Sequence, residues 1–350
     1  MIKNCLLVVL CTALTLGLAE LALSNFTGLG KFEYKIEVHT SEQGCYGNCY
    51  TSNPRGYFPI TYRVASKYVF PDAAAGDPGD VTLYCLAYAC QDRKRGFFPE
   101  RREEVFLVGD SFTFGEGVKN EDTLGYLLGL KFTRYNFRNF GETAADLKRV
   151  YQIEQDLFNE HRENGIKHLI YFYNLNDVAM SQEVARRQKY IIDFQNLRWS
   201  NVSGTDNPVM RFLSRLALYR LGVKAVVLHR ESVLTVKNYL DMYFGSSNAR
   251  QMQESMDMLV SMNTLARQKE AKLTIVLYPL LYKDPAGKYP FLAIHDLIMG
   301  VCTQNGIMCI DAYGAFKDQR SLAGFTVHPV DFHPNGLANR AVVDYLEGKL

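Results

Sequence analysis

From Val105 onward, two hydrophobic patterns alternate along the chain. Short continuous apolar runs predict buried strands, and apolar residues at every third or fourth position predict helices with one buried face. Strands that alternate with helices predict an α/β fold with a mostly parallel sheet. The expected strands are Val105–Val108, Tyr135–Phe140, His168–Tyr173, Leu273–Leu277 and Met308–Ile310. The expected helices are Tyr126–Phe132, Ala144–Asn164 with Gly165 as its cap, Pro290–Val301 and Gly336–Leu350.

Two regions depart from this alternation. Residues 26–100 are rich in Gly, Pro, Tyr and Phe, which predicts a small β-rich extension before a domain that spans residues 101–350. Residues 178–245 form an insertion within that domain, expected to shape a lid or a pocket rim. The strands expected in the extension are Tyr34–His39, Ile60–Ala65 and Val81–Tyr84. A helical stretch is expected near Arg211–Leu228, and Ser246 and Ser247 are expected to cap the next helix.

The first 25 residues are typical of a targeting segment. Lys3 is followed by an almost unbroken apolar run, Cys5–Ala19, which Glu20 interrupts. Such a run suits the core of a signal peptide, and extended to Leu23 it could span a membrane as a tilted anchor. The sequence leaves both alternatives open. Both predict that the rest of the chain is exported, to the periplasm or the cell exterior.

The cysteines outside this segment fall in close pairs. Close pairing in an exported chain favours disulfides, although spacing does not fix their connectivity. A zinc site is the weaker alternative, because the usual two-residue spacing and a nearby histidine are both lacking. The pairs are Cys45 with Cys49, Cys85 with Cys90, and Cys302 with Cys309.

Composition and charge narrow the class of protein. The 350 residues are 47% hydrophobic and 22% charged, as in an ordinary globular protein. A net charge of +2 gives no support for a nucleic-acid partner. The sequence contains no Gly-rich phosphate loop and no paired Cys-x-x-Cys signature.

A serine directly follows the first predicted strand, in Gly109-Asp110-Ser111. The carboxyl end of a buried parallel strand is where open α/β sheets bind ligands. If a helix begins there, backbone N–H groups and the positive end of its dipole surround the serine oxygen, which suits a nucleophile in acyl transfer. The alternative is a tight turn in which Asp110 and Ser111 only cap the helix.

Two further side chains could complete such a site. His333, in Asp331-Phe332-His333, is a candidate base, because a serine hydroxyl needs one near neutral pH. A carboxylate on its other ring nitrogen would fix the tautomer. The alternative is a local loop pair, and His328 is the nearest rival histidine. Asn176, after the third predicted strand, could donate to an oxyanion or could form a turn or cap with its neighbour.

In this order, the pieces resemble the SGNH, or GDSL, hydrolase family. The resemblance covers roughly Arg101 to Leu350. It implies a three-layer α/β/α sandwich with a mostly parallel, flavodoxin-like sheet. The motifs that carry it are GDSFTFGEGV at Gly109–Val118, NFGETA at Asn139–Ala144 and DFHPNG at Asp331–Gly336.

The resemblance implies a role for each matching position. Ser111 is the nucleophile, His333 is the general base and Asp331 is its orienting acid. The oxyanion hole is formed by the backbone N–H of Ser111, the amide of Asn176 and the backbone N–H of Ala144, or of Gly141 if the register differs.

Two positions depart from the family pattern. Ala144 stands where glycine is usual, so the backbone N–H is kept but a Cβ narrows the approach to it. Asp331 lies two residues before His333. Many members place the acid three residues before, where this chain has Val330, although the shorter spacing also occurs.

The activity that the resemblance implies is that of an exported serine esterase. It would cleave an acyl ester through an acyl-serine intermediate. The first candidate substrate is an acetyl ester on a carbohydrate. The segment Asn53–Phe58 is similar to one in exported, membrane-anchored bacterial members, which often accompany cell-surface polysaccharide synthesis. The expected partners are an acylated small molecule or glycan and, through the N-terminal segment, a membrane. No metal, organic cofactor or nucleic acid is expected.

Two other functions remain open from the sequence. The first is an O-acyltransferase with the same triad, in which a hydroxyl of a cell-surface polysaccharide takes the acyl group in place of water. The second is a non-catalytic glycan-binding or assembly protein on this fold, which the substitution at Ala144 keeps open.

Overall fold

The computed structural model describes residues 2–26, 35–40, 45–50, 58–63, 80–85, 94–101, 103–116, 118, 120–161, 165–182, 184–185, 216, 218, 235–282, 287–328 and 331–350. For residues 2–10 and 24–26, for the described residues between 35 and 85, and for residues 323, 328 and 331, it gives the backbone alone.

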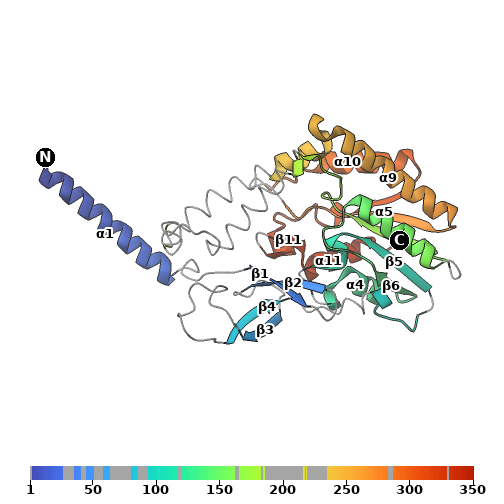
Figure 1. The fold of residues 1–350 in the computed structure, drawn as a ribbon, viewed down its shortest axis with the longest axis horizontal. Coiled ribbons are helices and arrows are strands. Elements are labelled where there is room, and N and C mark those ends of the chain that lie inside the picture. Colours follow the sequence, from blue (N-terminus) through green and yellow to red (C-terminus); the bar gives the residue numbers. More distant parts are fainter. Residues whose placement is uncertain are drawn as a thin grey trace.

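A five-stranded parallel sheet forms the core of the lobe that contains α4, α5, α9, α10 and α11, at the right of Figure 1. Its spatial order is β6-β5-β7-β8-β9, and each neighbouring pair runs parallel. This order, with the second strand outside the first, is the flavodoxin-like order expected from the sequence. The strands are β5 (Glu103–Gly109), β6 (Tyr135–Asn139), β7 (His168–Tyr173), β8 (Lys272–Leu277) and β9 (Met308–Asp311).

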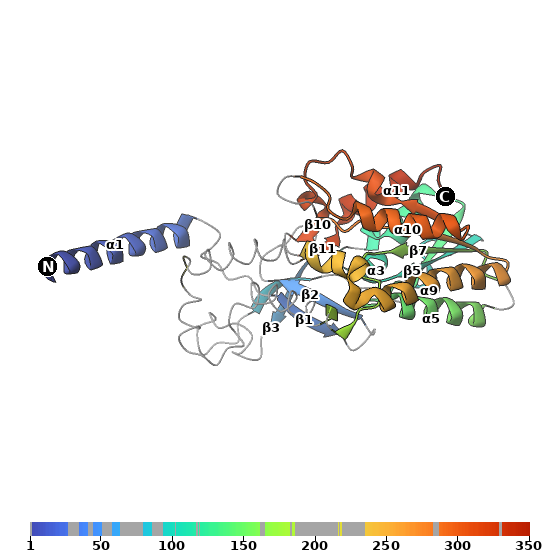
Figure 2. The same ribbon diagram turned by 90° about the horizontal axis from the view of Figure 1, so that it is seen from above.

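Helices cover both faces of this sheet. α5 and α9 pack against each other on one face, and α4 and α11 pack against each other on the other, as Figure 2 shows for α5, α9 and α11. α10 lies against β9 and α9. The predicted three-layer α/β/α sandwich is confirmed. The helices are α4 (Leu124–Lys131), α5 (Leu147–Glu160), α9 (Ala249–Gln268), α10 (Leu292–Gln304) and α11 (Gly336–Leu346).

The sheet strands are buried because both of their faces are covered. β5 is buried from Val105 to its end, and Tyr171, Phe172 and Tyr173 of β7 have no exposed surface. Strands in this position need apolar side chains on both faces, so they appear in the sequence as continuous apolar runs. For this reason all five sheet strands were predictable within two residues at each end.

Some helix ends differ from the prediction. α5 begins at Leu147 and not at Ala144, because Ala144 has a left-handed φ of +60° and Asp146 caps the helix through a 2.9 Å bond from the N–H of Arg149. The same helix ends at Glu160, before the predicted Gly165.

The two serines before α9 do not cap it. Ser246 and Ser247 lie in a 3₁₀ turn, η3 (Ser246–Asn248), and Asn248 occupies the cap position of α9 without a side-chain capping bond. The predicted helix near Arg211–Leu228 lies outside the described residues, apart from positions 216 and 218.

The N-terminal region contains a second, antiparallel sheet. Its spatial order is β1-β2-β4-β3. Three of its strands overlap the predicted ones, and β2 was not predicted. The domain boundaries drawn from composition stay predictions. The strands are β1 (Lys35–Thr40), β2 (Cys45–Tyr50), β3 (Phe58–Arg63) and β4 (Asp80–Cys85).

The chain begins with a long helix, α1 (Ile2–Phe26), labelled in Figure 1. Across the residues that the structure describes, no helix has the length and apolar character needed to cross a membrane. Side chains are described for one of the predicted cysteine pairs, and it is bonded: the Cys302–Cys309 disulfide joins α10 to β9.

Candidate active site

The nucleophile candidate stands where β5 turns into a short helix. Gly109 ends β5 with φ of +151°, and a Cβ there would lie 2.8 Å from the carbonyl oxygen of Phe172, so this position requires glycine. Asp110 is the cap of α3 (Ser111–Phe114) and accepts a 2.9 Å bond from the N–H of Phe112. The capping alternative is therefore right for Asp110. It leaves Ser111 as the first residue of the helix, with its hydroxyl not used for capping.

His333 lies beside this serine, on a strand that the sequence did not predict. β11 (Asp331–Pro334) pairs antiparallel with β10 (Thr326–His328). The two-stranded ribbon places Nε2 of His333 2.8 Å from Oγ of Ser111. This is hydrogen-bond distance, across 222 residues of chain.

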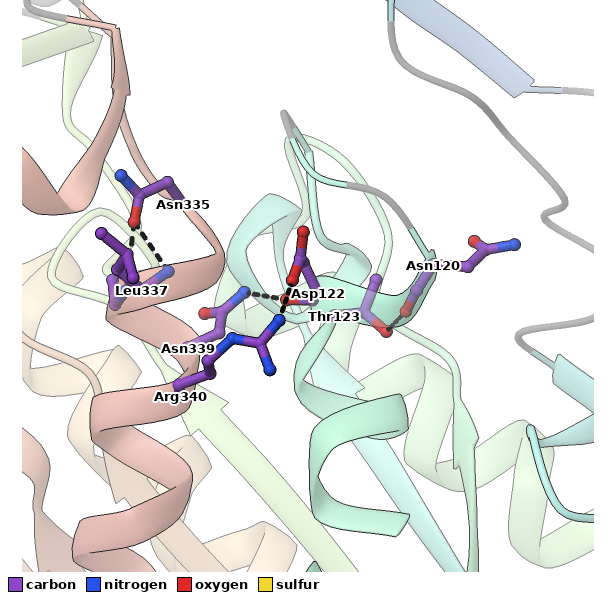
Figure 3. A network of polar contacts seen from close by, with 8 residues as sticks. Asn120, Asp122, Thr123, Asn335, Leu337, Asn339 and Arg340 are labelled. Carbon is purple, nitrogen blue, oxygen red and sulfur yellow. Dashed lines mark hydrogen bonds and ion pairs between the residues drawn. The ribbon is translucent and has the colours of Figure 1, made fainter. Parts of the chain in front are cut away.

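A polar network ties the segment after His333 to the segment after Ser111 (Figure 3). Asn335 caps α11 by accepting bonds from its first N–H groups. From the next turn of α11, the amide of Asn339 donates to the backbone oxygen of Asp122 at 2.9 Å, and Arg340 bonds the carboxylate of the same residue. A Cβ at Gly336 would lie 2.6 Å from Cγ of Asp122, so the two segments approach closely only because residue 336 is glycine. This network fixes the start of α11, which directly follows the His333 strand, against the segment around Asp122.

The end of β7 supplies the amide of Asn176. The turn there is held by its neighbours: Asn174 Oδ1 accepts from the N–H of Leu175 at 2.6 Å, and Asp177 Oδ2 accepts from the N–H of Asn174 at 3.0 Å. The amide of Asn174 donates to Oδ2 of Asp110 at 3.3 Å, and the amide of Asn176 also lowers the pKa of that carboxyl group. Oδ1 of Asn176 is buried without a hydrogen-bond partner in the described part of the chain. The turn is therefore stabilised by the side chains of Asn174 and Asp177, and not by that of Asn176.

Two backbone positions compete for the remaining oxyanion donor. The N–H of Gly141 already donates to Asn139 Oδ1 at 2.9 Å, and a Cβ at Gly141 would lie 2.2 Å from the backbone nitrogen of Phe114. Gly141 is therefore a packing glycine. Ala144 is exposed and left-handed, with φ of +60°, a conformation that favours glycine. This geometry favours the register in which Ala144 replaces the family's glycine.

The predicted acid, Asp331, can be placed by its backbone alone. It is the first residue of β11, two positions before His333. Its side chain lies outside the described part of the chain, so its role as the orienting acid stays a prediction.

The structure adds a carboxylate that sequence reasoning missed. Gly115 reverses the chain after α3 with φ of +83°, and the N–H of Glu116 donates to the carbonyl oxygen of Ser111 at 3.0 Å. Oε2 of Glu116 lies 3.7 Å from Nε2 of His333. The signal was present in the FGEG of the first motif, because a left-handed glycine before the glutamate returns the chain toward the serine.

Two buried carboxyl groups, those of Asp110 and Asp177, lie near Ser111. Burial raises the pKa of Asp110 to about 6. Four weaker interactions lower the same pKa, and they come from the Phe112 N–H, the charge of His333 and the amides of Asn176 and Asn174. Burial and the charge of Asp110 raise the pKa of Asp177 well above its ordinary range. Tyr171 donates to Asp177 at 2.6 Å.

No cluster of three or more His, Cys, Asp or Glu side chains suited to a metal ion occurs among the residues whose side chains are described. The groups that the structure brings together are Ser111, His333, Glu116 and Asp110 with Asn176. These can take a proton from a hydroxyl and can donate hydrogen bonds to an oxygen that gains negative charge.

Comparisons with known proteins give structural neighbours only. No family model and no curated protein matches the sequence. A lipolytic G-D-S-L family member from Veillonella parvula aligns with a TM-score of 0.41 and 13% identity, over 70% of this chain and 97% of its own. A putative lipolytic protein of the same family from Desulfitobacterium hafniense aligns with a TM-score of 0.41 and 14% identity, over 71% of this chain and 100% of its own.

A third neighbour has a named substrate. A catalytic mutant of an acetylxylan esterase from Geobacillus stearothermophilus aligns with a TM-score of 0.38 and 10% identity, over 71% of this chain and 94% of its own. In structure, the chain is similar to the SGNH, or GDSL, lipolytic proteins that its sequence motifs resemble.

Proposed function

We propose that the chain is a serine esterase that cleaves an acyl ester through an acyl-serine intermediate. The observation that carries this proposal is the 2.8 Å separation between Oγ of Ser111 and Nε2 of His333. The pair stands at the carboxyl end of β5, between β6 and β7 in the sheet, and the helix start leaves backbone N–H groups without helical partners.

In the first half of the reaction, His333 acts as a general base. Its neutral imidazole accepts the hydroxyl proton of Ser111 at Nε2 as Oγ bonds the ester carbonyl carbon. The carbonyl π electrons move to the oxygen, which becomes the oxyanion. The backbone N–H groups of Ser111 and Ala144 and the amide of Asn176 are the proposed donors to it.

In the second half, the same proton leaves with the alcohol. The oxyanion collapses, the bond to the alcohol oxygen breaks, and Nε2–H of His333 protonates that oxygen. Water then gives its proton to His333 and attacks the acyl-serine, and the collapse of the second oxyanion returns the proton to Oγ of Ser111.

Asp110 supports the oxyanion donor in this scheme. The amide of Asn176 lowers the pKa of Asp110, so its N–H side is favoured toward that carboxyl group. A side-chain amide has two N–H groups, so one can interact with Asp110 while the other donates to an oxyanion.

For the substrate and the location, we propose an acetyl ester on a carbohydrate and an exported protein. The carbohydrate part rests on the resemblance of Asn53–Phe58 and of the motifs to members associated with surface polysaccharides. Export is supported by the apolar N-terminal segment and by the Cys302–Cys309 disulfide, since disulfides persist mainly in oxidising compartments.

Hydrolysis of an aryl acetate by the full chain tests the esterase proposal. Ser111→Ala and His333→Ala should each abolish burst and turnover, and Ser246→Ala, an exposed serine before α9, should leave both unchanged. Activity that persists in Ser111→Ala would refute the mechanism. With an acetylated glycan donor and a second glycan present, release of free acetate indicates a hydrolase, and acetate found on the second glycan indicates an acyltransferase.

A further inference from the structure

Glu116 occupies a defined place beside the proposed base. Two backbone N–H groups, those of Gly115 and Glu116, donate to the carbonyl oxygen of Ser111, at 2.9 and 3.0 Å. The glutamate is therefore fixed to the backbone of the nucleophile itself. Its Oε2 lies 3.7 Å from Nε2 of His333, the same nitrogen that faces Oγ of Ser111.

The surroundings of this pair limit solvent screening. The side chain of Glu116 is only 10% exposed and that of His333 is 23% exposed. The ring of Phe112 lies 5.4 Å from the His333 ring, centroid to centroid, and contacts the ring of Tyr278 in turn. Charges that are partly withdrawn from water interact more strongly than charges at the surface.

We propose that Glu116 is a positioning residue for His333: its carboxylate stabilises the imidazolium that forms when His333 takes the proton of Ser111. This inference rests on the proposed function and adds a residue to it. The predicted orienting acid, Asp331, would act on the other ring nitrogen. Glu116 acts on the side of Nε2, where the proton arrives, and therefore favours the charged state that forms whenever His333 accepts a proton.

Among the described residues of the elements next to His333, three carry carboxyl groups. Glu116 follows α3, Asp110 precedes it, and Asp331 lies on β11 itself. The charge of His333 lowers the pKa of Asp110, so these two groups also interact. Removing the charge of Glu116 should lower the pKa of His333, because an opposite charge at this distance favours the imidazolium. The expected decrease is about one unit.

The experiment measures the pKa of His333 directly, by NMR titration of imidazole resonances in the full chain labelled at histidine. The resonance is assigned by its absence from His333→Asn. The titrated proteins are the wild type, Glu116→Gln, Glu116→Asp and, as a matched control, Glu121→Gln, which removes an exposed charge from the following loop. The pH profile of kcat/KM for an aryl acetate is recorded for each. If Glu116→Gln does not fold, Glu116→Ala is titrated in its place.

The proposal predicts a His333 pKa lower by about one unit in Glu116→Gln, with the acid limb of kcat/KM shifted equally. Glu116→Asp should stay closer to the wild type, and Glu121→Gln should match it. An unchanged His333 pKa in Glu116→Gln, with or without loss of activity, would overturn the proposal, since a purely structural glutamate leaves the titration in place. A shifted pKa in a protein without esterase activity would refute the proposed function and leave the Glu116–His333 interaction standing.

Discussion

Two histidines in this domain each lie between a hydroxyl and a carboxyl group, and only one arrangement suits catalysis. His295 lies 2.9 Å from the hydroxyl of Tyr289 through Nε2 and 2.9 Å from Asp311 through Nδ1. His333 lies 2.8 Å from Ser111 and 3.7 Å from Glu116, both through Nε2. The residue types are alike, so the difference must come from their surroundings.

Burial separates the two clusters. His295 is 1% exposed and Tyr289 is 6% exposed, and the Tyr289 ring stacks on another tyrosine ring at 4.3 Å. Burial raises the pKa of Tyr289 well above its ordinary value, so its hydroxyl stays neutral and tied to the histidine. The imidazole of His295 bonds one partner at each nitrogen. The bond to Asp311 joins α10 to the end of β9, so the cluster has a structural role. In the other cluster the hydroxyl belongs to the first residue of a helix at the sheet edge where ligands bind.

Removing the hydroxyl from each cluster should give the largest contrast. Ser111→Ala should lower kcat for an aryl acetate by about 10⁴- to 10⁶-fold, because it removes the nucleophile. Tyr289→Phe should leave kcat within about threefold of the wild type and lower the free energy of unfolding by about 1 kcal/mol. Stopped-flow hydrolysis and urea unfolding measure the two effects. A Tyr289→Phe variant as inactive as Ser111→Ala would abolish the distinction between the clusters.

The oxyanion donor should give the next effect. Asn176→Ala should lower kcat by about 10²- to 10³-fold, because a transition-state donor is lost. Asn305→Ala, which removes an exposed amide at the end of α10, is the control and should keep wild-type kcat. Steady-state kinetics with one ester distinguishes them. Equal rates for both variants would exclude Asn176 from the site.

Leucine in place of His295 should reduce stability, whereas leucine in place of His333 should reduce activity. His295→Leu should lower the free energy of unfolding by about 2–3 kcal/mol, because Tyr289 and Asp311 lose their shared partner, while activity per folded molecule is kept. His333→Leu should lose activity with little change in unfolding, since its side chain is 23% exposed. Urea unfolding with an activity assay on the folded fraction tests this pair. Loss of activity in folded His295→Leu would contradict the structural role.

The remaining prediction concerns stability alone, at a buried glutamate of the sheet-covering helix α5. Both carboxyl oxygens of Glu154, on α5, lack hydrogen-bond partners in the described part of the chain, and burial raises its pKa to about 9. Because the folded pKa lies above the unfolded one, the stability associated with the protonated group is complete below about pH 4.5 and is lost as pH rises toward 9. Between pH 5 and pH 8, the wild type should lose about 1.4 kcal/mol per pH unit relative to Glu154→Gln. Parallel stability curves for the two proteins would refute the raised pKa of Glu154.

The parallel sheet and the strand-to-helix turn that carries Ser111 were predictable because local patterns determine them. A strand covered on both faces needs a continuous apolar run, and a tight strand-to-helix turn needs the glycine and the capping aspartate that precede Ser111. Both signals lie within a few residues of sequence. The order of Ser111, Asn176 and His333 along the chain resembles that of the SGNH family, and this resemblance predicted that the three residues lie in one site.

The remaining features depend on contacts that the local sequence does not contain. The β10–β11 ribbon is short and one strand ends in proline, so its pattern resembles a loop until the two strands pair. The role of Glu116 depends on a left-handed glycine that brings it back to Ser111. The late start of α5 depends on the left-handed Ala144, a conformation that alanine rarely adopts.

The central claim is that the hydroxyl of Ser111 is an activated nucleophile and that the hydroxyl of Tyr289 is not. Reaction with a fluorophosphonate, which forms a stable adduct with an activated serine, tests it most directly when the labelled peptide is identified by mass spectrometry. The account predicts one adduct, on Ser111, which is absent from Ser111→Ala, strongly slowed in His333→Leu and unchanged in Tyr289→Phe. A wild-type protein that forms no adduct, or a Ser111→Ala protein that labels as fast as the wild type, would contradict it.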